Sequence, residues 1–401
     1  MKKLYIRNFG PVKDAEIEVR RFNVFIGEQS VGKSTIAKLI TIFTDYLNIA
    51  FLSSEKGNAW KNLLENFDLL SCVASPDYYV RFEDKTDKYS ILLEFSGTEN
   101  KSAIISDGKK LEEQRDVIAF MMKIKPIYHK DKLLPSKIKN LSEEEILKYV
   151  VDAFRNSIYV PAERIIGPLA FKLLPAMMMA KEQIPNNLLK FITNLNNAKA
   201  KYTEFQLDLL NVTYKVENEN EYVVLNNGKQ LPLRNASSGM QSLIPLILVL
   251  TYGKENTQYE SFVVEEPECN LFPEKQKQLL EMLLSDIYHD RRTLTITTHS
   301  PYLLSALNNY LYAGLIVEEL GKGIHAEVSS LVNEKLWIKA EDISVYSLGE
   351  NINGGKYCKS ILDPESGMID FNYLDSVSMT MSEEFTKMQR IYVKEKRKSQ
   401  K

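Results

Sequence analysis

The sequence predicts an α/β protein with a mixed, mostly parallel sheet, an antiparallel β lobe and a helical insertion. Two observations lead to this fold class. Two strongly apolar strands, 261–266 and 293–300, flank a helical segment rich in Gln, Lys and Leu, and such alternation is typical of parallel sheets with helices packed on them. Residues 78–107 instead contain short strands separated by charged turns, which is the pattern of an antiparallel meander.

Hydrophobic periodicity also predicts the N-terminal elements. Residues 4–19 alternate apolar and polar side chains around a Gly10-Pro11 break, which indicates two strands joined by a turn. Residues 21–27 form a third strand, and apolar spacing over 35–52 predicts the helix that follows it.

The middle of the chain is expected to be mainly helical. Apolar residues recur at helical spacing over 111–154, and again over 168–211, where they predict the helical insertion. A short strand ended by Pro161 separates the two helical regions, and a hairpin with an Asn227-Gly228 turn follows them.

We expect residues 1–310 to form one domain and residues 311–401 a C-terminal extension. With 401 residues, 44% of them hydrophobic, the chain can bury a large core. Its last eight residues, KEKRKSQK, are basic, and we expect this tail to be disordered and solvated.

Composition narrows the classes of function. The net charge of -2 gives no strong basic field for nucleic acid or anionic lipid, so DNA or RNA binding would have to come from a local patch. The three cysteines, Cys72, Cys269 and Cys358, are far apart and lack metal-ligand spacing, which argues against a disulfide framework or a zinc site. No apolar run is long enough to span a bilayer, so we expect a cytoplasmic protein with no membrane partner.

The segment GEQSVGKST fits the phosphate-loop pattern G-x-x-x-x-G-K-[ST] between a predicted strand and a predicted helix. Its glycines let backbone N–H groups and the helix N-terminus face phosphates. Lys33 would bind the β- and γ-phosphates, and the Ser34 hydroxyl would ligate Mg²⁺. A plain Gly-rich turn is the simpler alternative, but the strand-to-helix context disfavours it. The candidate nucleotide-binding residues are Gly27, Glu28, Gln29, Ser30, Val31, Gly32, Lys33, Ser34 and Thr35.

Polar residues end both of the apolar strands. Glu265 and Glu266 close the first strand, where two adjacent carboxylates need a cation or a solvated cleft. Glu265 would hold the Mg²⁺, although Asp is commoner at such a position, and Glu266 would activate the attacking water. His299 ends the second strand and would donate a hydrogen bond to the γ-phosphate. By themselves, the carboxylates would more often be a solvated strand terminus, and a lone His more often a structural residue.

The segment NASSGMQSLIPLILVL, residues 235–250, places two serines, a glycine and a glutamine before an apolar run. Ser237 or Ser238 is suited to cap a helix there. The sequence by itself does not explain why the glycine and the glutamine follow.

The order of these motifs resembles the head domain of ABC-type ATPases: a phosphate loop, then Ser-Ser-Gly-Met-Gln, then a strand ending in paired acids, then a strand ending in His. Within that class, LYIRNFGPVKDAEIEV, EEPECNLFP and THSPYLL are similar to the SMC, RecF and OLD branch of small bacterial ATP-binding proteins. The resemblance implies ATP and Mg²⁺ as cofactors and ATP hydrolysis as the activity.

The resemblance also implies a homodimer closed through its ATP sites, with a higher oligomer as a further option. In that family the signature loop acts in trans, so Ser237, Ser238 and Gly239 would face the nucleotide of a second chain while Gln241 supports the loop. The segment YVPAER stands roughly where ABC proteins keep a Gln that senses Mg²⁺ and water. Glu163 or Arg164 would substitute for that Gln, or the two would form a surface ion pair at a strand exit.

No coiled-coil arm of SMC length fits between Lys33 and Ser238, and no D-x-D, H-N-H or H-E-x-x-H pattern marks a nuclease or protease. The chain therefore resembles stand-alone ATPase subunits of two-gene antiphage systems, such as the Septu and PARIS types, in which a separate nuclease or toxin is the effector. A RecF-like DNA-repair ATPase is the alternative, and a transporter ATPase subunit a third.

Overall fold

A six-stranded sheet forms the centre of the molecule. The computed structural model describes residues 1–53, 59–111, 116–117, 120, 157–168, 184–256, 259, 261–288, 292–350, 354–370 and 372–399. The predicted helical region 111–154 lies almost entirely outside them. The central strands, in spatial order, are β16 (Cys358–Ser360), β15 (Ile343–Leu348), β3 (Phe22–Gly27), β14 (Thr293–Thr297), β13 (Ser261–Glu265) and β8 (Ile158–Val160). All neighbours pair in parallel except β15 with β16, which confirms the predicted mixed, mostly parallel sheet.

The two faces of the central sheet are buried by different layers, and β3 shows this most directly. All six of its residues are buried. Val24 and Ile26 belong to one hydrophobic core, whereas Phe25 between them belongs to the other, because successive side chains of a strand point to opposite faces. The first core is formed with α8 (Asn186–Lys201), α9 (Ser238–Glu255), α10 (Pro273–Leu283) and α11 (Pro301–Leu320).

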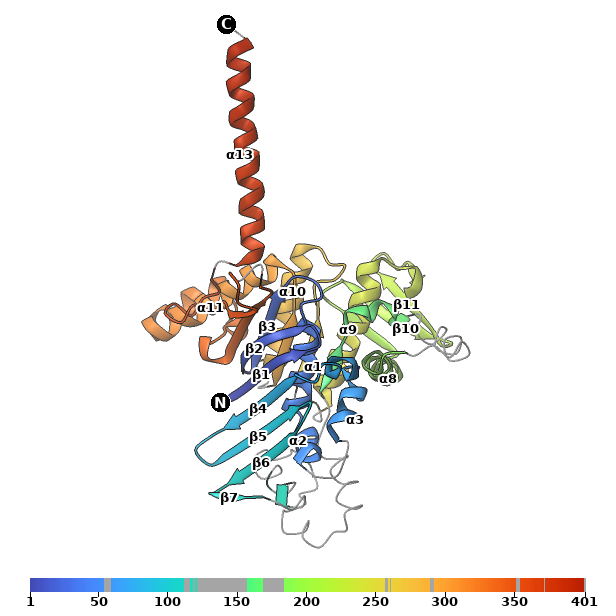
Figure 1. Ribbon diagram of the computed structural model, residues 1–401. Helices are drawn as coiled ribbons and strands as arrows, with labels where there is room; N and C mark the ends of the chain where they lie inside the picture. The colour runs from blue at the N-terminus through green and yellow to red at the C-terminus, as the bar shows by residue number, and fades with distance from the viewer. Residues whose placement is uncertain are drawn as a thin grey trace.

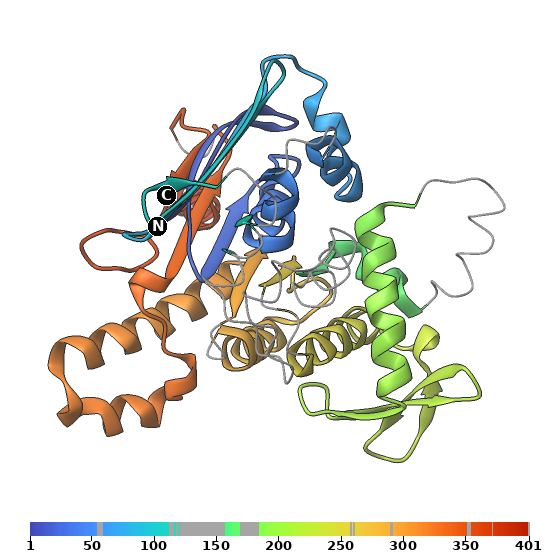
Figure 2. The ribbon, with the colours of Figure 1, turned by 90° about the horizontal axis from the view of Figure 1, so that it is seen from below.

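The predicted antiparallel lobe is confirmed, and it is larger than expected. The two N-terminal strands join the meander, so that six strands follow the order β2-β1-β4-β5-β6-β7. This sheet encloses the second core with α1, α2 and α3, and these helices lie beside it in Figures 1 and 2. The elements are β1 (Lys2–Phe9), β2 (Val12–Val19), β4 (Tyr79–Lys85), β5 (Tyr89–Ser96), β6 (Asn100–Ser106), β7 (Lys109–Lys110), α1 (Lys33–Thr44), α2 (Tyr46–Ser53) and α3 (Ala59–Asn66).

The predicted helix over 35–52 is interrupted at Asp45. Its backbone is extended, with φ -87° and ψ 114°, and its carboxylate accepts a hydrogen bond from Asn48 N at 3.4 Å. Asp favours such local bonds over a helix interior, so it divides the segment into α1 and α2.

The predicted helical insertion, 168–211, is only partly helical within the described residues. It contains α8, but β9 (Glu204–Leu207) follows before the segment ends. The strand pairs with β10 (Val212–Glu217) in a four-stranded antiparallel sheet completed by β11 (Asn220–Leu225) and β12 (Gln230–Pro232). The predicted hairpin is confirmed as the β11–β12 pair, with Gly228 at φ +77° in its turn.

The C-terminal extension departs most from expectation. The proposed boundary at residue 310 falls inside α11, and β15 pairs with β3 in the central sheet. The tail expected to be disordered instead continues α13 (Tyr373–Ser399), because Met, Glu, Lys and Arg are good helix formers. The remaining short elements are α12 (His325–Leu331), a π-helical turn at Leu284–Tyr288, and 3₁₀ turns at Leu70–Val73, Ala162–Ile166, Leu233–Asn235, Lys322–Ile324, Glu334–Leu336 and Ala340–Asp342. None of the helices in the described ranges is long and apolar enough to cross a membrane.

Candidate nucleotide-binding site

The phosphate-loop residues connect β3 to α1, as predicted. Gly27 ends the strand at φ +145°, and a Cβ there would lie 2.3 Å from the carbonyl oxygen of Leu348. Gly32 caps α1 at φ +86° in the left-handed region. Both positions therefore require glycine, and the loop that they permit delivers the chain to the N-terminus of α1, where N–H groups favour anions.

Lys33 lies inside this loop. Its ammonium group donates hydrogen bonds to the carbonyl oxygens of Gly27 at 3.0 Å and Glu28 at 2.6 Å. Burial lowers the pKa of Lys33, while the nearby carboxylates, Glu266 foremost, oppose that shift. Gln29 and Ser30 are exposed. The buried Lys33 cation is therefore part of a loop whose middle is accessible to solvent.

Tyr357 supports the loop from the C-terminal extension, and the sequence analysis missed it. Its hydroxyl contacts the carbonyl oxygens of Val31 and of Pro11, the latter at 2.8 Å. Burial raises the pKa of Tyr357 to about 12, so the hydroxyl keeps its proton for these contacts at neutral pH. Only the tertiary fold brings Tyr357 to the loop, because 326 positions in the sequence separate it from Val31.

The predicted magnesium ligands have the required chemistry. Glu265 is 6% exposed, and its Oε1 accepts no hydrogen bond within the described part of the chain. A buried carboxylate oxygen without a donor is costly unless a cation binds it. Ser34 is exposed in the first turn of α1, and carboxylate and hydroxyl oxygens are ligands that Mg²⁺ prefers. The two residues fit the group that the sequence predicts.

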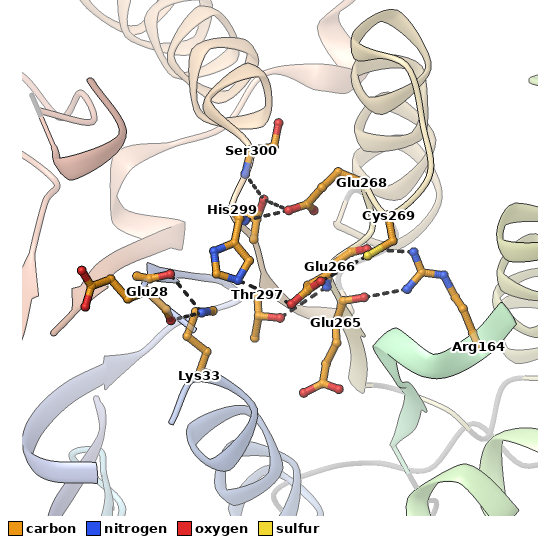
Figure 3. A network of polar contacts seen from close by, with 12 residues as sticks. Glu28, Lys33, Arg164, Glu265, Glu266, Glu268, Cys269, Thr297, His299 and Ser300 are labelled. Atoms are coloured by element: carbon orange, nitrogen blue, oxygen red, sulfur yellow. Dashed lines mark hydrogen bonds and ion pairs between the residues drawn. The ribbon is translucent and has the colours of Figure 1, made fainter. Parts of the chain in front are cut away.

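Glu266 and His299 are brought together where β13 and β14 end. The carboxylate Oε1 of Glu266 lies 3.5 Å from Nε2 of His299, and Cys269 Sγ donates to Oε2 at 3.1 Å. Glu266 adopts a left-handed φ of +43°, held by its N–H bond to the carbonyl oxygen of Thr297 at 2.9 Å. Figure 3 shows Glu266, His299 and Lys33 pointing toward one another.

The pKa of Glu266 falls to about 2, chiefly because of the hydrogen bond with His299, and further because of Cys269 and Lys33. A depressed folded-state pKa adds stability above the usual carboxyl value and loses it as the pH falls toward the folded value. We therefore expect the difference in melting temperature between the parent and Glu266→Gln to shrink as the pH drops from about 5 toward about 3. Thermal unfolding across this range measures it, and a constant difference would contradict the assigned shift.

A third carboxylate, Glu268, was not predicted. Its Oε1 accepts hydrogen bonds from the Thr298 hydroxyl at 2.7 Å and from the backbone N–H of His299 at 2.6 Å. Burial raises the pKa of Glu268. The residue thus fixes the backbone that carries His299. The signal was in the sequence, since Glu268 follows Glu266 by two positions in EEPE.

Of the two weaker candidates, Arg164 joins the site and Glu163 does not. Arg164 is fully buried and donates to the carbonyl oxygens of Glu265 at 2.7 Å, Glu266 at 2.8 Å and Pro267 at 3.2 Å. Burial lowers its pKa, and neighbouring thiol and carboxyl groups oppose that shift. Glu163 is exposed. The expectation of a surface ion pair at this position is therefore wrong, because Arg164 holds the backbone of the acidic strand end.

Arg164→Met should destabilise the fold by about 3 kcal/mol, because buried carbonyl oxygens lose a charged donor. ATP turnover should also fall, since those carbonyls belong to the residues that carry the carboxylates. Chemical denaturation measures the first effect, and steady-state hydrolysis the second. Arg7→Met is the control, because Arg7 is exposed and its removal should change neither. Unchanged stability in Arg164→Met would contradict the role.

The signature residues occupy the N-terminus of α9. Ser237 is the N-cap, and its hydroxyl accepts from Met240 N at 3.4 Å, so the cap interpretation is confirmed for this residue. Gln241 donates to the carbonyl oxygens of Arg234 and Ala236, at 3.1 and 2.7 Å. Ser237 and Ser238 are exposed. Among the described residues, no hydrogen bond or ion pair joins the signature to the Lys33 loop.

Gly239 has a packing constraint within its own chain. A Cβ at this position would lie 2.9 Å from the carbonyl oxygen of Asn270, in the turn that follows the acidic strand end. The signature and the segment EEPECNLFP are therefore in contact through backbone. A side chain at Gly239 would displace that turn.

Comparison with known proteins shows the family of the chain. Residues 1–164 and 169–304 match the family model described as AAA ATPase domain, and no curated protein matches at a significant level. Among solved structures, the chain is similar to the SMC head domain from Thermotoga maritima, with 15% identity, a TM-score of 0.34, and coverage of 76% of this chain and 90% of that one.

The recombination mediator protein RecF gives 14% identity and a TM-score of 0.31, over 75% and 92% of the two chains. A dimeric bacterial ABC transporter cassette gives 13% and 0.28, over 76% and 91%. Likeness this distant carries no information about activity or partners. The family model, in contrast, covers most of the chain, which therefore belongs to the AAA ATPase domain family.

Proposed function

We propose that the chain binds ATP with Mg²⁺ and hydrolyses it at the site formed by the Lys33 loop, Glu266 and His299. One observation carries the proposal. Oε1 of Glu266 lies 3.5 Å from Nε2 of His299, and the buried Lys33 ammonium group lies near both side chains. Phosphoryl transfer needs mainly positioning and charge stabilisation, and these three groups supply both.

Each residue has a distinct task in this proposal. Lys33 exchanges its bonds to Gly27 and Glu28 for the β- and γ-phosphate oxygens, and the N-terminus of α1 adds N–H groups. Ser34 and Glu265 would hold Mg²⁺, which would supply positive charge to neutralise the phosphates.

Glu266 orients the attacking water. With a pKa of about 2, its carboxylate is ionised at neutral pH and is therefore available as an acceptor. Its role is to orient the attacking water and to accept its proton as the bond to phosphorus forms, while His299 donates a hydrogen bond to the γ-phosphate.

Removal of the metal tests the proposal directly. Phosphate release by the purified chain should require Mg²⁺ and should stop when a chelator is added. A chain carrying Lys33→Ala, assayed in parallel, controls for contaminating phosphatases. Hydrolysis that persists with chelator, at equal rates in both chains, would reject this site.

We also propose that two chains close around ATP, with Ser237 and Ser238 facing the partner's nucleotide. Both side chains are exposed at a helix N-terminus, which is a favourable end for a phosphate. ATP closure would then be the signal that the protein transmits.

The receiver of that signal, we infer, is a separate effector such as a nuclease or toxin in antiphage defence. The sequence has no D-x-D, H-N-H or H-E-x-x-H pattern, and we therefore expect the purified chain by itself not to cleave DNA or RNA. Affinity purification from its host, with ATP and without, should recover the effector. Retention on DNA that depends on ATP and weakens with salt would instead favour the RecF-like alternative.

A further inference from the structure

Helix α13 carries an apolar stripe that is open to solvent. Its 27 residues extend about 40 Å, and Figure 1 shows the helix projecting away from the body. Leu374 at its base packs against the first hydrophobic core. Beyond that base, Met381, Phe385, Met388 and Tyr392 are 64%, 57%, 59% and 64% exposed. Apolar side chains gathered on an isolated helix mark an interaction surface.

The spacing of the stripe identifies the kind of partner. Successive members are four, three and four residues apart, which is the a/d repeat of a two-stranded coiled coil. Met379, Ile391 and Val393 are also exposed, at 55%, 63% and 45%, but lie off this repeat. A helix with the same repeat is therefore the matching surface, and we propose that α13 pairs with α13 of a second copy of this chain, in antiparallel orientation.

Charge selects the antiparallel orientation. The first half of α13 is acidic, with Asp375, Glu383 and Glu384, whereas Lys387, Arg390 and the sequence KEKRK make the second half basic. Parallel pairing would place the two basic halves against each other. Antiparallel pairing sets each basic half against an acidic one, and complementary charge fixes orientation and register.

The stripe itself fits the reversed partner. The spacing of four, three and four reads the same in both directions, so two antiparallel copies stay in register along the whole stripe. Phe385 then faces Met388 of the second copy, and Met381 faces its Tyr392. Every layer joins a thioether to an aromatic ring, which is a favourable contact, whereas parallel pairing would stack each residue on itself.

This interface differs from the proposed ATP sandwich and does not rest on it. Antiparallel pairing of helices about 40 Å long leaves the two bodies at opposite ends of the pair. Pairing through α13 should occur without ATP, and only the larger assemblies that ATP would form from these pairs rest on the proposed sandwich.

Sedimentation of the full chain without nucleotide tests the pairing. The parent should sediment as a dimer, and Met381→Glu should shift it to a monomer, because the substitution puts a charge into the apolar layer. Met379→Glu is the matched control, with the same change two residues away and off the stripe, and it should remain dimeric. A parent that stays monomeric at every concentration, or equal loss in both variants, would overturn the proposal.

Cross-linking tests the orientation. Chains with Met381→Cys and Tyr392→Cys, carrying different tags, should form a mixed disulfide when combined and oxidised, since only antiparallel pairing opposes these positions. The parent, with Cys72, Cys269 and Cys358, sets the background. Disulfides formed within each variant by itself, with none between the two, would establish a parallel pair and reject the proposed orientation.

Discussion

Replacing Glu266 with Gln should lower the rate of ATP hydrolysis by about two to four decades while ATP binding persists. The amide keeps the size of the side chain and removes the charge that faces His299 Nε2 at 3.5 Å. Because the pKa of Glu266 is about 2, the substitution changes the charge of the site at every pH at which the enzyme would be assayed. The water then loses the carboxylate that accepts its proton.

Lys33→Ala should have the opposite effect, on ATP binding first. It removes the phosphate-binding cation and should weaken ATP binding, so that saturation needs far more nucleotide. Equilibrium binding of ATP and single-turnover hydrolysis, measured on both variants, separate the two effects. Glu163→Gln is the matched control, because Glu163 is exposed close to Arg164 in the chain but outside the site, and it should behave as the parent. Hydrolysis by Glu266→Gln at the parental rate would show that another group orients the water.

Mixing two inactive variants should restore roughly a quarter of the parental activity if the signature acts in trans. Lys33→Ala disables a chain's own loop, and Ser238→Glu sets a carboxylate against the γ-phosphate of its partner. In a mixed dimer both lesions fall in one composite site, which leaves the other site intact. With free exchange, half of the dimers are mixed and half of their sites are active.

The structure decides which signature residue to change. A side chain at Gly239 would meet the carbonyl oxygen of Asn270 in its own chain, so inactivity there would not distinguish trans action from local damage. Ser238 is exposed, and a Glu in the first turn of α9 suits the helix dipole. The Ser237 cap also stays in place, so the variant should fold normally.

Two further measurements make the mixing result decisive. Subunit exchange is followed with differently tagged chains, and ATP-dependent dimerisation is measured for each variant. If Ser238→Glu by itself is fully active, Ser238 does not contact the partner's nucleotide. Capping of α9 by Ser237 would then be the only role left for these two serines. Exchange without any recovery of activity would indicate that the signature acts in cis or that the two sites fire only together.

The sequence was sufficient wherever local pattern controls structure. The apolar run of β3, the glycines of the phosphate loop and the first turn of α1 lie within a few residues of one another, and their geometry follows from backbone preference. The sequence placed Glu266 and His299 at the ends of two apolar strands, and the structure brings them together because parallel neighbouring strands end at the same edge of a sheet. The nucleotide-binding loop and both strand ends could therefore be found from residue order.

Contacts between distant segments were decided only by the tertiary structure. Tyr357 reaches the loop because β15 pairs with β3, and no local pattern encodes that pairing. Arg164 can be buried because it donates hydrogen bonds to three carbonyl oxygens of the acidic strand end. In the sequence, its position next to Glu163 suggested only a surface ion pair. Burial and long-range hydrogen bonding depend on which elements pack together. Tyr357 and Arg164 belong to the site because of such contacts, and sequence periodicity, which reports only on neighbouring residues, could not reveal them.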